Sequence, residues 1–275
     1  MRNNENFSGT AEPGGNFGAS SRSENAAAIQ NAFTQQAAGF AAGGLHFSKQ
    51  EYLSHVVRCI APEKTDAVLD AAAGTCACGR ALAPFVRHVT CLDLTPAMLD
   101  AGCAAAEKDG LTNLSFVAGD TAALPFPAAA FDVVVSRLAF HHFPEIVRPF
   151  SEMARVLKPG GRLALIDMEA APEPLRQRED ALERLRDPSH VRNLSREELL
   201  SLFSSHGLSV RHVEATRFPV RLTDWLDFTD TPPAAREEIT ARLRAELSGG
   251  EKTGFFPYEK DGALFFDQRW LLILA

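Results

Sequence analysis

Short, almost fully apolar runs alternate with helix-like segments through the middle of the chain, and this alternation constrains the fold most. The runs cover residues 67–73, 89–94, 114–118, 131–136 and 162–168. The intervening segments carry helical spacing, and one of them has Pro96 in its first turn. Strands that are apolar on both faces belong to parallel sheets covered by their crossover helices. The pattern therefore predicts an α/β fold with a doubly wound, Rossmann-like sheet.

Composition excludes several classes of protein. The chain has 275 residues, of which 45% are hydrophobic, and a formal net charge of −7. Such a chain buries a large core, and its acidic balance argues against a nucleic-acid partner. It has five cysteines, and an odd number in a chain of this size does not indicate a disulfide framework. We therefore expect a protein of the reducing cytoplasm. The sequence has no secretory signal and no apolar run long enough to span a membrane.

Changes in pattern along the chain predict its organisation. We expect a disordered tail (1–27), an N-terminal helical lid (28–65), a cofactor-binding core (66–170) and a C-terminal part that completes the sheet and the substrate side (171–275). In the last part, Ser195 followed by Glu198 is a capping box that predicts a helix. The final apolar run is either a strand or a partner surface, so a homodimer stays open.

Acidic residues close the predicted strands. Asp70 ends the first, and Asp93, nineteen residues after Gly74, ends the second; Asp120 follows the third. The carboxyl ends of parallel strands meet at one edge, so one crevice should hold these acids beside the small-residue loop around Gly74. An acid in the position of Asp93 accepts hydrogen bonds from both ribose hydroxyls of an adenosine. The sequence therefore predicts an adenosine-cofactor site.

The loop and its charges favour one cofactor. A dinucleotide prefers G-x-G-x-x-G, but Cys76 stands at the middle glycine of that frame. Three acids would also repel a pyrophosphate, whereas they suit S-adenosylmethionine, whose two positive groups outweigh its one carboxylate. We therefore expect the methyl donor, with an NAD-dependent oxidoreductase as a rival interpretation.

Several ordered motifs carry a family resemblance. VLDAAAGTCACGRALA, VTCLDLTPAML and EMARVLKPGGRLALIDM resemble the class I S-adenosylmethionine-dependent methyltransferases over about residues 66–170. The branch is the methyltransferase type 11 domain of the ubiquinone/menaquinone biosynthesis enzymes, although residues 183–199 resemble less studied relatives. The resemblance implies about seven strands, the last antiparallel. It also implies transfer of a methyl group to a small-molecule acceptor, with S-adenosylhomocysteine as product.

The resemblance also implies roles for individual residues. The first motif would hold the methionine portion of the cofactor through Asp70, Ala72, Gly74 and Thr75. At the end of the second strand, Asp93 would bind the ribose, and Leu94 and Met98 would flank the adenine. Asp120 and Thr121, after the third strand, would meet the adenine edge, and Ser136, at the end of the fourth, would lie near the sulfonium. Ala72 and Cys76 stand where the family has glycine. Cys76 could rearrange the loop or weaken cofactor binding, which leaves a non-catalytic binder as an alternative.

Candidate catalytic residues follow the fourth run. His141 or His142 could take the proton that an acceptor loses on methylation, and Arg137 could orient an anionic acceptor. Each has a structural alternative, because a histidine can cap a helix or pack in the core, and an arginine can pair with an internal acid. His190 precedes the predicted capped helix in a segment that could fold over the active site, and its alternative is the structural role of a loop histidine.

Some local patterns carry alternative or negative interpretations. Asp120 and Thr75 could instead be a turn residue and a helix cap. Cys76-x-Cys78 has neither the spacing nor the partners of a metal site, so no metal is expected. No basic amphipathic stretch supports stable membrane association, which disfavours a quinone methyltransferase at a membrane surface.

Overall fold

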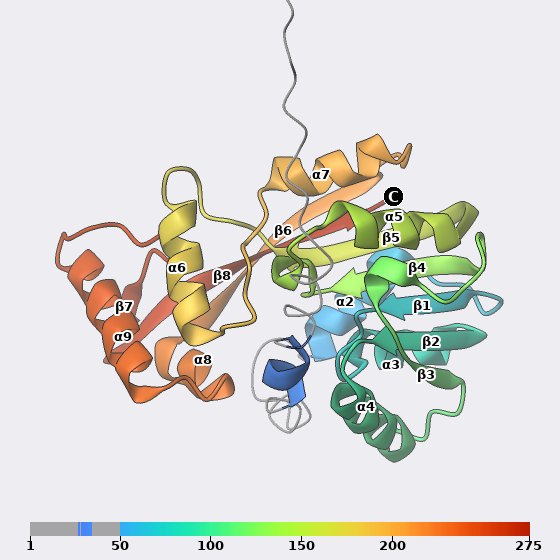
Figure 1. Cartoon of the computed structure of the whole chain (residues 1–275), viewed down its shortest axis with the longest axis horizontal. Helices are drawn as coiled ribbons and strands as arrows, with labels where there is room; N and C mark the ends of the chain where they lie inside the picture. Colours follow the sequence, from blue (N-terminus) through green and yellow to red (C-terminus); the bar gives the residue numbers. More distant parts are fainter. Residues whose placement is uncertain (1–26, 28, 35–49) are drawn as a thin grey trace, which may run out of the picture.

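One mixed sheet runs through the whole molecule (Figure 1). The computed structural model describes residues 27, 29–34 and 50–275. The strands are β1 (Ala67–Ala71), β2 (His88–Asp93), β3 (Leu114–Ala118), β4 (Phe131–Arg137), β5 (Leu157–Met168), β6 (His212–Arg221), β7 (Tyr258–Lys260) and β8 (Ala263–Leu274). Their order is β3-β2-β1-β4-β5-β8-β6, with β7 paired to β8 off this path.

The sheet has the predicted doubly wound topology. β1 pairs in parallel with both β2 and β4, so the strand order reverses at β1. β8, the last strand in the chain, is antiparallel to both β5 and β6. Ligands of open α/β sheets bind beyond the carboxyl ends of the strands at this reversal. The fold prediction is confirmed, and it places the crevice above β1 and β4.

Helices cover both faces of the sheet. They are α2 (Gln50–Ile60), α3 (Ala77–Leu82), α4 (Pro96–Lys108), α5 (Val147–Val156), α6 (Arg176–Arg186), α7 (Arg196–Ser205), α8 (Leu222–Phe228) and α9 (Pro233–Leu247). α2, α3 and α4 pack with Val68, Val133 and their neighbours on one face. α5 and α7 pack with Leu69 and Val134 on the other. Successive strand residues thus point to opposite cores, which explains why the runs are apolar throughout.

The C-terminal part has a smaller core of its own. β6 and β8 pair over ten residues and project beyond the parallel strands, where α6, α8 and α9 pack around them (Figure 1). Trp225 and Phe266 are fully buried at the centre of this core. The final apolar run is therefore a strand that forms a hairpin with β7, and Asp261 and Gly262 have the positive φ that a tight turn requires. The capping box at Ser195 is confirmed at the start of α7.

The N-terminal predictions are only partly within the described residues. Residues 29–34 are helical and α2 begins at Gln50. The predicted tail, apart from residue 27, and the part of the lid at 35–49 lie outside the described residues. Of the helices that the structure describes, none is long and apolar enough to cross a membrane.

Candidate active site

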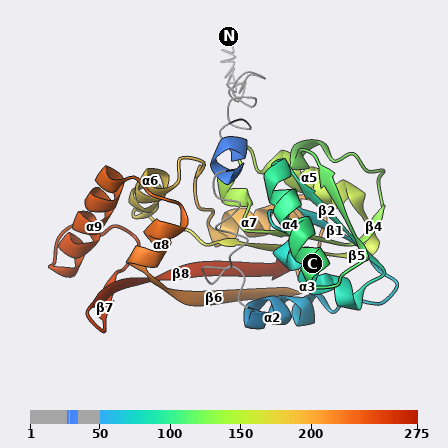
Figure 2. The same cartoon turned by 90° about the horizontal axis from the view of Figure 1, so that it is seen from below.

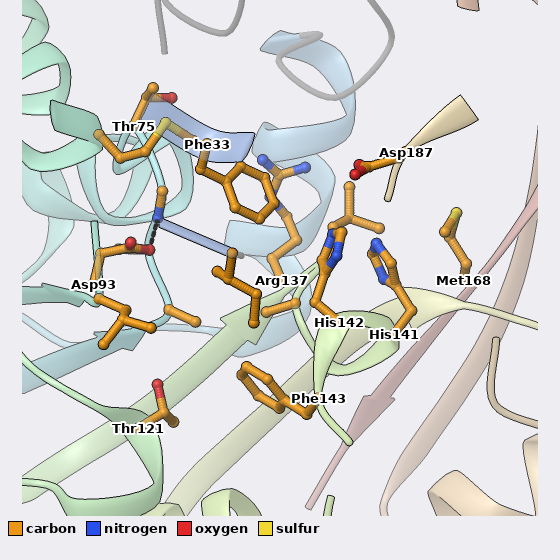
Figure 3. Close-up of a pocket in the computed structure, with 18 of the residues that line it drawn as sticks. Phe33, Thr75, Asp93, Thr121, Arg137, His141, His142, Phe143, Met168 and Asp187 are labelled. Carbon is orange, nitrogen blue, oxygen red and sulfur yellow. Dashed lines mark hydrogen bonds between the residues drawn. The ribbon is translucent and has the colours of Figure 1, made fainter. Parts of the chain in front are cut away.

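A pocket lies at the strand-order reversal and collects most of the predicted site residues. Those that line it are Ala72, Gly74, Thr75, Asp93, Leu94, Met98, Asp120, Thr121, Arg137, His141 and His142. Figure 3 shows the acid and the glycine loop on one side of the pocket and the two imidazoles, beside Arg137, on the other. Residues separated by more than 60 positions in the chain therefore meet in one pocket, as the convergence of strand ends predicts.

Asp93 is held in place by the loop that it faces. Gly74 N donates to Asp93 Oδ2 over 2.7 Å, and Thr95 N donates to Oδ1 over 2.8 Å. Burial raises the pKa of Asp93, and these backbone hydrogen bonds oppose the rise. A carboxylate offers about four lone-pair sites, so the two oxygens retain acceptor capacity for ribose hydroxyls. The acid is oriented before any ligand arrives.

Asp70 and Ser136 do not line the pocket. Asp70 Oδ2 accepts a hydrogen bond from Gly79 N over 2.7 Å, and burial raises the pKa of Asp70 to about 7. Ser136 is fully buried behind the pocket wall. Both face a core because neighbouring strand residues alternate in direction. Asp70 thus supports the start of α3 from beneath the loop, and any direct contact of these two residues with the methyl donor stays a prediction.

The two departures from glycine both adopt left-handed backbone conformations. φ is 55° at Ala72 and 58° at Cys76, values that cost a residue with a side chain about 1–2 kcal/mol. Cys76 is fully buried, and the pocket lining among the described residues does not include it. A Cβ on Gly102 of α4 would lie only 2.7 Å from Cys76 Sγ. The thiol therefore fills space that a helical glycine leaves, and the cofactor loop stays open to the pocket.

This packing predicts the effect of Gly102→Ala. Alanine favours a helix by about 1 kcal/mol, but its methyl group would also lie 3.1 Å from the Thr75 backbone. We expect a net loss of about 1–2 kcal/mol in the free energy of unfolding, measured by urea denaturation. In the Cys76→Gly background the loss should shrink, because the thiol contact is gone. An equal loss in both backgrounds would contradict the proposed packing.

His141 forms a buried pair with Asp167, which ends β5. His141 Nδ1 lies 2.6 Å from Asp167 Oδ1. Asp167 also accepts backbone hydrogen bonds from Ala139, Phe140 and Met168. Burial alone would raise the pKa of Asp167, but His141 and the backbone donors outweigh it and lower the pKa. An ionised carboxylate only accepts, so His141 Nδ1 carries the donated hydrogen, and in the neutral form of the ring Nε2 is the nitrogen that can accept a proton.

His142 is held as a neutral ring. Its Nδ1 lies 3.1 Å from the carbonyl oxygen of Ser189, and its ring meets Phe33 edge-on at 4.9 Å between centroids. Burial, followed by the neighbouring His141, lowers the pKa of His142 to about 3, and Asp187 opposes this shift. The two imidazole centroids are 4.1 Å apart, beside Met168 in Figure 3. The pocket thus holds imidazole in its basic form at neutral pH.

The low pKa of His142 predicts acid sensitivity. The unfolded chain binds a proton at this ring below about pH 6.5, whereas the folded chain does so only near pH 3. Stability should therefore fall as pH falls, by about 2 kcal/mol between pH 6.5 and 5. In His142→Gln this part of the pH slope should be absent from urea denaturation, and in the surface control His88→Gln it should persist. Identical slopes in wild type and His142→Gln would contradict the assignment.

Arg137 offers a positive charge to the pocket. Its Nη1 is buried without a hydrogen-bond partner among the described residues. The side chain is half-buried and its charge already acts on the buried Asp70, so Nη1 is left to bond to an anionic group of a ligand. Arg186, at the end of α6, also lines the pocket; its Nε pairs with Glu183 and it lies over the ring of Trp225 at 4.5 Å, but its Nη1, like that of Arg137, is buried without a hydrogen-bond partner in the part of the chain that the structure describes.

His190 stays outside the pocket. Its Nε2 lies 3.0 Å from Asp180 Oδ1, and its side chain is buried. Asp180 also accepts from the backbone of Asn193. The ring centroid of His190 also lies 5.7 Å from that of His141, so this histidine packs behind the pocket, and its role stays a prediction.

Sequence reasoning missed several residues of the pocket. They are Ile29, Phe143, Asp167, Met168, Arg186, Asp187, Phe228, Thr229 and Gln268, of which Asp167 lies behind the lining and contacts His141. Asp167 had a signal, since it is an acid at the end of the fifth apolar run, like Asp70 and Asp93 before it. The residues beyond 170 had none, because only the path of the C-terminal part brings them to the pocket.

Comparisons with known proteins agree with this geometry. The family model described as a methyltransferase domain matches residues 69–165. The uncharacterized methyltransferase YcgJ of Bacillus subtilis is 32% identical over 198 residues, which cover 72% of this chain and 78% of YcgJ. This chain belongs to the S-adenosylmethionine-dependent methyltransferases. The crystal structure of the YcgJ protein superposes on this methyltransferase with a TM-score of 0.74 at 28% identity, covering 84% of this chain and 97% of that one.

The predicted branch is also represented. The demethylmenaquinone methyltransferase of Clavibacter sepedonicus is 29% identical over 72% of this methyltransferase and 78% of its own length. Family membership makes S-adenosylmethionine the cofactor and S-adenosylhomocysteine the product, and it replaces the NAD-dependent interpretation. A methyl acceptor of small-molecule size follows from the same membership.

Proposed function

We propose that the pocket binds the methyl donor in the orientation that the strand ends suggest. The ribose hydroxyls would bond to Asp93, and the adenine would lie between Leu94 and Met98. The methionine portion would follow the loop at Gly74 and Thr75. Support comes from the shared pocket lining and from the Gly74–Asp93 hydrogen bond that joins the loop to the acid. Asp120 and Thr121 also line the pocket, and we propose that they meet the adenine edge.

The helical segment 29–34 is proposed as a lid over this cofactor. Ile29 and Phe33 line the pocket, and Gln30 Nε2 donates to Leu94 O over 2.8 Å. This bond ties the segment to the adenine side of the pocket. A lid excludes water, which strengthens the electrostatic contacts around the sulfonium.

The His141–Asp167 pair carries the proposal for the reaction. We propose that His141 takes a proton from the acceptor while the acceptor attacks the methyl group. The new bond joins the acceptor atom to the methyl carbon, and the methyl–sulfur bond breaks with its electrons staying on sulfur. The released proton goes to His141 Nε2, and Asp167, 2.6 Å from Nδ1, stabilises the imidazolium. His142, neutral at physiological pH, would line the same path.

The walls suggest what the acceptor looks like. Phe33, Phe143, Met168 and Phe228 give the pocket apolar surface, and Arg137 supplies a positive charge. We propose an aromatic or otherwise apolar small molecule with a weakly acidic hydroxyl and an anionic substituent. The acidic net charge of −7 makes a nucleic-acid acceptor unattractive. We likewise expect no stable membrane association and a cytoplasmic protein, while a homodimer stays open.

Cys76 no longer gives a reason to favour a non-catalytic binder. That alternative rested on a bulky side chain at the cofactor, and the thiol packs against α4 instead. Loss of turnover would have to come from another change, which no described residue suggests.

A labelled-methyl assay tests the proposed function. Protein would be incubated with methyl-labelled S-adenosylmethionine and matched acceptors carrying a phenolic hydroxyl, an amine or a thiol, each with and without a carboxylate. We expect transfer mainly to the hydroxyl compounds, improved by the carboxylate, and loss of that improvement in Arg137→Gln. Transfer to thiols alone, unaffected by His141→Gln, would contradict the proposed base. Product formation without any acceptor is the background control.

A further inference from the structure

A second cluster of reactive side chains lies on the opposite side of the sheet from α5 and α7. His55 and Cys59 stand one turn apart on α2 and so share a helix face. His212 and Glu214 are two residues apart on β6 and so point to the same face of the strand. Figure 2 shows α2 lying along β6, which brings these two faces together. The cluster takes no part in the pocket at the strand-order reversal, because the pocket lining does not include these residues.

The donor atoms of the cluster converge. His55 Nε2 is 2.9 Å from Glu214 Oε2 and 3.5 Å from Cys59 Sγ. The ligand atoms of these three residues all lie within 4.8 Å of one another, and within the described chain they are the one such group. His212 Nε2 approaches the same Glu214 oxygen, at 3.1 Å. Both imidazoles approach one carboxylate oxygen, but His212 lies outside the group of three whose donor atoms are all close to one another.

Chemistry and size point to a particular kind of ion. A tetrahedral Zn²⁺ with bonds of about 2.0–2.3 Å separates its donor atoms by roughly 3.3–3.8 Å. The observed separations need only small side-chain movements to reach that range. Thiol and imidazole ligands select zinc and similar transition metals, whereas Mg²⁺ and Ca²⁺ require oxygen ligands. The side chains of His55, Glu214 and His212 are 34%, 32% and 42% exposed, so an ion can enter from solvent.

We propose that His55, Cys59 and Glu214 bind Zn²⁺, and that His212, which lies outside this group of three, moves toward the ion to become the fourth ligand. On binding, the Cys59 thiol loses its proton to solvent and the thiolate bonds to the metal. The ion would link α2 to β6 and so hold α2 on the sheet, where Tyr52 already packs against Phe218 and Trp270 with ring centroids 5.1 Å apart. The sequence predicted no metal, because it separates the two halves of this site by more than 150 residues.

Cobalt is the probe that tests the site, since Co²⁺ replaces Zn²⁺ and its spectrum reports a thiolate ligand. Tag-free full-length protein would be stripped with a chelator and titrated with Co²⁺, then with Zn²⁺. We expect a near-ultraviolet thiolate-to-cobalt band, visible d–d absorption of a tetrahedral ion, and loss of both signals when Zn²⁺ is added. Zn²⁺ should also raise the melting temperature by several degrees, and Mg²⁺ should not.

Matched variants assign the ligands. Cys59→Ser should abolish the thiolate band, and Glu214→Gln should weaken Zn²⁺ binding on the order of 100-fold, since even residues behind the ligands contribute 10–100-fold. Cys103→Ser is the control. Cys103 lies on α4, outside the proposed site, and like Cys59 it has a glutamate nearby, Glu107 one turn away. Cobalt binding without a thiolate band, or a band lost in Cys103→Ser and kept in Cys59→Ser, would overturn the proposal. These readouts do not depend on methyl transfer, so they stand apart from the proposed function.

Discussion

Asp93→Ala is expected to weaken binding of S-adenosylhomocysteine by roughly 100-fold. The carboxylate would accept two hydrogen bonds from the ribose, each worth about 1.5–3 kcal/mol when one partner is charged. A total near 3 kcal/mol corresponds to about 100-fold in Kd. Calorimetric titration of the purified protein measures this directly, and it needs no knowledge of the acceptor.

The control for this prediction is Asp100→Ala. Asp100 is an exposed acid on α4, close to Asp93 in sequence but absent from the pocket lining. Its removal should leave Kd within about twofold, in line with the small energies of exposed charges. Asp93 also holds the Gly74 amide, so circular dichroism should show that the variant folds. Unchanged affinity in a folded Asp93→Ala protein would remove the ribose contact from the proposal.

His141→Gln and Asp167→Asn are expected to lower turnover with a hydroxyl acceptor by roughly 100-fold or more. General-base catalysis contributes about 10²–10⁴-fold, and Asp167 orients the ring through its 2.6 Å contact with Nδ1. Cofactor affinity should stay within about twofold, because neither change touches the ribose or adenine side.

Two comparisons separate catalysis from a general loss of structure. His88 is the first residue of β2, at the end of the strand opposite to Asp93, and bonds to Ser115. His88→Gln should therefore leave turnover unchanged. The double variant should lose no more turnover than either single variant, because the two residues act as one unit. Multiplicative losses, or full turnover in His141→Gln, would show that the pair does not act as the base.

The cofactor side of the pocket could be predicted because it depends on local order in the chain. Strand, glycine loop and helix follow one another between residues 67 and 108, so Gly74 and Asp93 meet wherever the parallel pairing of β1 and β2 forms. Asp70 shows the limit of that reasoning. It ends the same strand that carries the loop, yet the alternation of the strand turns its carboxylate toward Gly79 and away from the pocket.

The acceptor side could not be predicted because it depends on how distant segments pack. Asp187 and Phe228 reach the pocket only through the paths of α6 and α8, which rest on the projecting ends of β6 and β8. The burial that lowers the pKa of His142 likewise comes from the whole surrounding fold. No spacing in the sequence encodes these contacts.

The sequence by itself determined the parallel sheet, the meeting of Gly74 and Asp93 at its carboxyl edge and, together with the family resemblance, the class of cofactor. Periodicity, loop composition and strand-end acids act over short stretches, and their consequences are the same in any packing. Tertiary structure alone decided the His141–Asp167 pair, the fit of Cys76 against Gly102, and the meeting of α2 with Glu214. Each of these requires two elements to approach within a few ångströms, and that approach is set by packing of the whole core rather than by neighbouring residues.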